Sequence, residues 1–158
     1  MNRNVVIGLG HHYRSDDDAG LEAARRLRAR SLRKTAVIEH EGDAVDLVQL
    51  WAGAQVAVVI DAVRSGMAPG TIHRVDVTGE RIPDHPRRDS SHAVGLADAV
   101  ELGRALGLLP DRLVVVGIEG ADFTPGVGLS PEVAVAVDEV VELVVAEMMP
   151  LAALGGTG

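Results

Sequence analysis

The chain has 158 residues and no cysteine, and hydrophobic residues make up 47% of it while aromatic residues make up 2%. This length fits one domain with one core, and the missing thiols exclude disulfides and cysteine-based metal sites, so any metal must bind oxygen and imidazole ligands. The formal net charge of −8 disfavours a nucleic-acid backbone as partner, because binding to phosphates needs an excess of Lys and Arg.

The first third of the chain alternates apolar strands with amphipathic helices. Residues 4–9 form a continuous apolar run that predicts a buried strand, and a helix is expected over about 16–30. Ser15 and Asp18 have the spacing of a capping box at its start. Its last turns are basic and complement the negative end of the helix dipole, with Arg25, Arg26, Arg28 and Arg30.

The same rhythm continues through the middle of the chain. Residues 35–40 predict a second strand, Asp43 caps a helix that Gly53 closes, and residues 55–62 predict a third strand. The third strand shows no alternation of apolar and polar residues, as expected when helices cover both faces of a parallel sheet.

The last half is expected to add two strands and two helices. Residues 71–77 alternate with period two, which predicts an edge strand whose antiparallel direction stays open. Residues 78–91 are polar and predict a flexible surface loop. The remaining predicted elements are a helix from Ser90 or Ser91 to about 107, a strand over 112–118, and a helix from Pro131 to about Met148 with Ser130 as its N-cap.

These elements predict an α/β fold with a mostly parallel, five-stranded sheet. We expect a single, monomeric domain over residues 1–150, with a flexible C-terminal tail at 151–158. The N-terminal apolar run is too short for a signal peptide, and no stretch approaches the ~20 apolar residues that span a bilayer. We therefore expect a cytoplasmic protein without a membrane partner.

Three potential metal ligands follow or begin predicted elements. Asp17 comes after the first strand, Asp61 ends the third apolar run, and His92 heads a helix. Because the ends of parallel strands open on one crevice, these residues can converge on a divalent metal ion.

Other residues beside this site have competing interpretations. Asp18 suits helix capping, whereas Asp16 fits either a cap or a ligand. His11 is the leading auxiliary ligand, and it and Asp16 are candidates for a general base. The remaining histidines are rival ligands: His12, His40, His73 and His85.

Two catalytic or binding classes find little support. Gly8 and Gly10 suggest a nucleotide or phosphate site, but Tyr13 replaces the third glycine and the acidic turn repels phosphate. The chain lacks the GxSxG elbow of a serine hydrolase, and Ser91 and His92 would point in different directions on a helix.

Four ordered blocks resemble the hydrogenase maturation proteases, which trim the large subunit of nickel-iron hydrogenases. The blocks are GLGHHYRSDDDAG at 8–20, IDAVRSGMAPGT at 60–71, SSHAVGLADAV at 90–100 and GIEGADFTPGVGLSPEV at 117–133. His11 stands where the family usually has Asn, and Asp18 where it usually has Gly or Ala.

The resemblance implies a three-layer α/β/α sandwich around a twisted, mostly parallel sheet. It implies that Asp17, Asp61 and His92 are the catalytic, metal-contacting residues of an endopeptidase. The expected partner is the large-subunit precursor, which delivers nickel and loses a short C-terminal extension, and other divalent metals are alternatives for the same site. A noncatalytic metal-sensing or chaperone-like module that binds the large subunit is the alternative.

Overall fold

The computed structural model describes residues 3–78 and 91–149, with the side chains of 91–94 outside this description. The predicted surface loop at 78–91 and the predicted tail at 151–158 therefore lie almost wholly outside the described residues. The described elements, in chain order, are β1 (Asn4–Leu9), the 3-10 turn η1 (Ser15–Asp18), α1 (Ala19–Ala29), β2 (Thr35–His40), α2 (Ala44–Trp51), β3 (Val56–Val63), β4 (Ile72–Asp76), α3 (Ser91–Leu106), β5 (Arg112–Glu119) and α4 (Pro131–Met148).

The five strands form one sheet in the order β2-β1-β3-β5-β4. The pairs β1–β2, β1–β3 and β3–β5 are parallel, and β4 pairs with β5 in the antiparallel direction. The predicted α/β fold is confirmed, and the edge strand whose direction the sequence left open is antiparallel.

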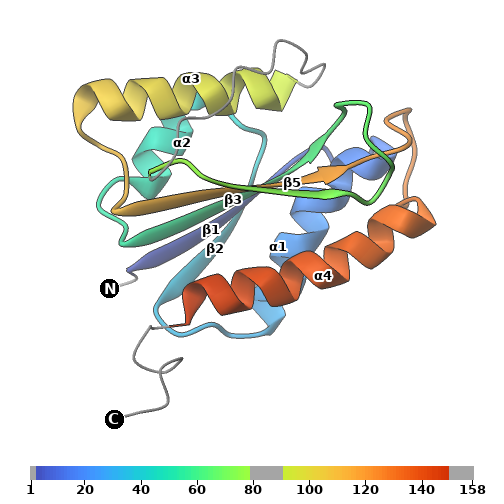
Figure 1. Ribbon diagram of the computed structural model, residues 1–158, viewed down its shortest axis with the longest axis horizontal. Helices are drawn as coiled ribbons and strands as arrows, with labels where there is room; N and C mark the ends of the chain where they lie inside the picture. The colour runs from blue at the N-terminus through green and yellow to red at the C-terminus, as the bar shows by residue number, and fades with distance from the viewer. Residues whose placement is uncertain (1–2, 79–90, 150–158) are drawn as a thin grey trace.

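Helices cover both faces of the sheet, with α2 and α3 on one side and α1 and α4 on the other (Figure 1). The strand residues alternate between the two layers because successive side chains point to opposite faces. Beneath α2 and α3 lie Val5, Ile7, Leu9, Ala57, Val59 and Leu113, and beneath α1 and α4 lie Val6, Val58, Ile60, Ala62, Val114, Val116 and Ile118. This is the three-layer sandwich that the resemblance implied.

Glycines let the first βα unit pack closely against β3. A Cβ added to Gly20 at the start of α1 would clash with the carbonyl oxygens of Leu9 and Ile60, and one added to Gly8 would clash with the carbonyl of Gly20. The backbone of α1 therefore rests directly on the ends of β1 and β3, which fixes where η1 emerges.

The helix ends differ in part from the capping predictions. Asp43 caps α2 as predicted, because its side chain accepts hydrogen bonds from the backbone N–H groups of Val45 and Asp46. The predicted capping box of Ser15 and Asp18 is wrong, since η1 precedes α1 and neither helix has a side-chain cap.

The described part of the chain, 3–78 and 91–149, contains no helix long and apolar enough to cross a membrane.

Candidate active site

Two of the predicted ligands lie at the carboxyl end of the parallel sheet. Asp17 lies in η1, just after β1, and Asp61 lies in β3, one residue beyond the last β1–β3 pair, Gly8 with Ile60. From β1 the chain continues to β2 on one side, whereas β3 lies on the other side of β1. The carboxyl ends of β1 and β3 therefore form a topological switch point of the sheet. Both carboxylates are buried, with 5% of Asp17 and 2% of Asp61 exposed.

The first turn of α3 reaches the same end of the sheet. Asp61 follows Ala57 and Val59 in the alternation of β3, so its side chain is on the face that α2 and α3 cover. Gly95 in α3 lies so close to Gly42, just after β2, that a Cβ on Gly95 would clash with the Gly42 carbonyl oxygen. His92 is one turn before Gly95.

The side chain of His92 is outside the described residues, so the predicted convergence of all three ligands stays a prediction. Within the side chains that are described, no group of three or more His, Cys, Asp or Glu residues is arranged to hold a metal ion.

Asp16 organises the loop that follows β5. Its side chain is fully buried, and its Oδ2 accepts hydrogen bonds from the backbone N–H of Ala121 at 2.7 Å, that of Asp122 at 2.9 Å and the Ser130 hydroxyl at 2.8 Å. Its Oδ1 accepts from the Ser130 N–H at 2.7 Å. The carboxylate thus ties η1 to the start of α4. Ser130 is the N-cap residue of α4, as predicted, but its side chain binds Asp16 and makes no capping hydrogen bond.

Ser15 strengthens the same connection. Its backbone N–H donates to the Gly126 carbonyl at 3.1 Å and its hydroxyl to the Thr124 carbonyl at 2.8 Å. Ser15 has a φ of +53°, an uncommon conformation for a residue with a side chain. The turn that carries Asp17 is therefore held from two directions, by α1 and by the loop after β5.

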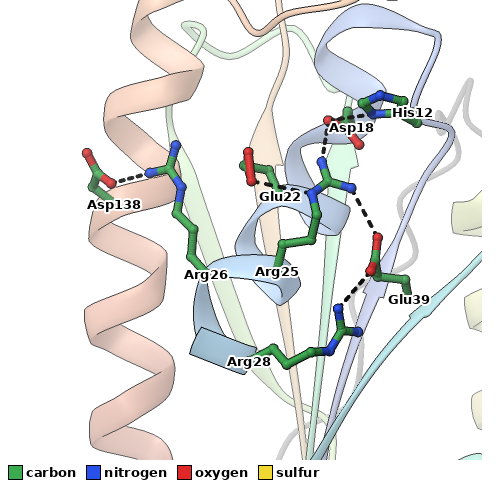
Figure 2. A network of polar contacts seen from close by, with 8 residues as sticks. All are labelled: His12, Asp18, Glu22, Arg25, Arg26, Arg28, Glu39 and Asp138. Atoms are coloured by element: carbon green, nitrogen blue, oxygen red, sulfur yellow. Dashed lines mark hydrogen bonds and ion pairs between the residues drawn. The ribbon is translucent and has the colours of Figure 1, made fainter. Parts of the chain in front are cut away.

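Asp18 belongs to a charged network that connects α1 with β2 and with the loop after β1 (Figure 2). Its Oδ2 accepts from Arg25 at 2.6 Å and lies 3.2 Å from Nδ1 of His12. Burial lowers the pKa of the Arg25 guanidinium, but the charges and hydrogen bonds of Asp18 and Glu22 outweigh it and raise that pKa. Arg25 also binds Glu39 at 3.0 Å, so the acids at positions 18 and 39 share one guanidinium.

The other arginines of the basic run form ion pairs with carboxylates, in addition to complementing the helix dipole. Arg28 binds Glu39 at 3.0 Å, Arg26 binds Asp138 and Arg30 binds Glu142 at 2.5 Å. The last two pairs fasten α1 to α4.

His11 lines a shallow groove of about 580 Å³ between the loop after β1 and the end of β2, bounded by residues 10–14, Leu21 and residues 39–41. Its Nδ1 is 3.9 Å from the exposed Glu41 carboxylate. His40, another rival ligand, lies 3.2 Å from Asp46 and accepts the Gly42 N–H at 2.9 Å.

Glu119 is an almost completely buried acid that the sequence predictions missed. Its Oε1 lies 2.9 Å from Nε2 of His73 and accepts from the Ser65 hydroxyl, and its Oε2 accepts from the Ser65 N–H at 3.2 Å. Glu119 ends the apolar run of β5, just as Asp61 follows the apolar run of β3. An acid at the end of an apolar strand is therefore the sequence signal that would have identified Glu119.

Comparisons with known proteins agree on one family. The sequence model of a family described as hydrogenase maturation protease matches residues 21–147. A Methanocaldococcus jannaschii protein named for that activity is 30% identical, over 91% of this chain and 95% of the relative. The hydrogenase 2 maturation protease of Escherichia coli K12 is 27% identical over 92% of this chain and 90% of its own length. The solved structure of the hydrogenase maturating endopeptidase HybD from E. coli gives a TM-score of 0.74 at 25% identity, and the match covers 92% of this chain and 91% of that one.

Proposed function

Because the chain belongs to the hydrogenase maturation protease family, we propose that it removes a C-terminal extension from the large-subunit precursor of a nickel-iron hydrogenase after nickel insertion. As a family member it is an endopeptidase. In the proposal, Asp17, Asp61 and His92 contact the nickel that the precursor carries, so that only a loaded precursor is held for cleavage.

The observation that supports this role is the position of Asp17 and Asp61. Both carboxylates are buried at the switch point of the sheet, where ligands of open α/β folds bind. Carboxylate oxygens and an imidazole suit a borderline divalent metal and leave coordination positions open for a group of the precursor. Bound in this way, the nickel of the precursor would supply Lewis-acid polarisation of the scissile carbonyl or of a water molecule.

The neighbouring acids do not compete for the metal on equal terms. Asp16 already accepts four hydrogen bonds and Asp18 is paired with Arg25. The role of His11 or Asp16 as an auxiliary ligand stays a prediction. An anionic nucleotide is disfavoured at this turn because three buried carboxylates occupy η1.

The test is cleavage of purified large-subunit precursor, loaded with nickel or free of it, followed by mass spectrometry. We expect the wild-type protein to shorten only the loaded precursor, and Asp17→Asn, Asp61→Asn and His92→Gln to lower the rate at least about 100-fold. Asp138→Asn, which alters a carboxylate on the outer face of α4, is the matched control and should cleave at the wild-type rate.

Two results would contradict the proposal. Cleavage by all three site variants at the wild-type rate would exclude their role in recognising nickel. Binding of the precursor by the wild-type protein without any change in precursor mass would indicate the noncatalytic module instead.

A further inference from the structure

His73 and Glu119 form a histidine–carboxylate pair beside Asp61. In the register of the sheet, Asp61 on β3 pairs with Gly117 on β5, and Gly117 pairs with His73 on β4. Directly paired residues point to the same face of a sheet, so Asp61 and His73 share the face beneath α2 and α3. Two strand spacings put their backbones about 10 Å apart.

The residue between them has no side chain. A Cβ on Gly117 would lie 3.2 Å from Cγ1 of Val63 and 3.6 Å from Cβ of His73. The methyl groups of Val63 therefore cover this glycine on the face that carries Asp61 and His73.

Glu119 fixes the orientation of the imidazole. The Glu119 side chain is 1% exposed, whereas that of His73 is 37% exposed, so the carboxylate is buried behind a ring that solvent reaches. A carboxylate accepts hydrogen bonds, so the proton between them is assigned to Nε2 of His73, which leaves Nδ1 as the basic nitrogen. Ser65 donates two hydrogen bonds to Glu119 and keeps this carboxylate in place.

We propose that His73, oriented by Glu119, is the general base and then the general acid of peptide hydrolysis in this site. The inference rests on the proposed function, and it supplies the proton-transfer group that the nickel-contacting residues do not provide. His73 is a catalytic residue in this scheme, and Glu119 is a positioning residue that stabilises the imidazolium ion.

The proton is transferred twice at Nδ1 of His73. As the water oxygen bonds to the scissile carbonyl carbon, Nδ1 takes a proton from that water. As the C–N bond breaks, its electron pair goes to the nitrogen, and Nδ1 returns the proton to this leaving amine. One water is consumed, a carboxyl group and an amine are formed, and His73 ends neutral.

The experiment measures kcat and KM for cleavage of nickel-loaded precursor by the wild-type protein and by His73→Gln, His73→Ala and Glu119→Gln. Asp138→Asn is the control, because this exposed carboxylate belongs to α4, on the other face of the sheet. We expect His73→Gln to lower kcat about 100-fold or more with little change in KM, and Glu119→Gln to lower kcat less. Added imidazole should restore part of the kcat of His73→Ala, because the position is open to solvent, but not that of Glu119→Gln.

A kcat of His73→Gln equal to that of Asp138→Asn would overturn the inference. So would a slow His73→Ala protein that imidazole does not accelerate, because a purely structural histidine would behave in this way. A wild-type protein that leaves the loaded precursor intact would instead refute the proposed function itself.

Discussion

Removal of the Asp16 carboxylate is predicted to destabilise the whole fold. In Asp16→Ala, the N–H groups of Ala121, Asp122 and Ser130 and the Ser130 hydroxyl lose a buried acceptor. Four hydrogen bonds at a net value of about 1 kcal/mol each give a loss of about 4 kcal/mol in the free energy of unfolding. For a chain of this length, that corresponds to a fall of about 8–16 °C in Tm.

Asp16→Asn provides a graded comparison. An amide oxygen in place of Oδ2 retains three acceptor contacts, but its NH₂ group then faces the Ser130 N–H, where two donors meet. We expect a loss of about 2 kcal/mol, roughly half that of the alanine variant.

Urea unfolding followed by circular dichroism measures both values. Asp122→Ala is the control, because the Asp122 carboxylate is exposed and accepts hydrogen bonds from the neighbouring Thr124, and it should change the unfolding midpoint much less. An Asp16→Ala protein within about 1 kcal/mol of wild type would show that the loop after β5 does not depend on this carboxylate.

Three further results are expected. Arg25→Ala leaves the buried Asp18 carboxylate without its main cation and should lower the free energy of unfolding by about 3 kcal/mol in urea titrations; an unchanged midpoint would contradict this. Gly20→Ala places a methyl group against two backbone carbonyls and should lower the free energy of unfolding by at least about 3 kcal/mol. The loss would be measured as a lower Tm or as a loss of soluble protein, whereas wild-type stability would show that α1 can shift. The hydrogen bond and the charge of Arg30 lower the pKa of Glu142, so Arg30→Gln should raise that pKa toward its ordinary value in an NMR titration, and an unaltered titration would exclude the ion pair in solution.

The sequence predicts the sheet well because its signals are local. The bounds of β1 and β2 agree with the predicted strands at 4–9 and 35–40, where continuous apolar runs stand between polar turns. The period-two pattern of 71–77 likewise identified β4 as an edge strand, and its position beside β5 alone confirms this.

The polar contacts of the site could not be predicted from the same signals. The partners of Ser15 and Asp16 lie 105–114 residues away in the chain, so no spacing rule connects them. The spacing of Ser15 and Asp18 suggested a local cap. In the folded chain, Ser15 instead binds Thr124 in the loop after β5, and Asp18 binds Arg25 on α1.

The order of the strands has a consequence for synthesis on the ribosome. β4 is complete at residue 76 but occupies the outside position, and β5, which begins at residue 112, must enter between it and β3. Until β5 emerges, the nascent chain therefore presents the apolar edge of β3 without its final neighbour, a surface prone to pairing with other chains. Early binding of this edge by a chaperone would favour correct assembly of the newly made protein.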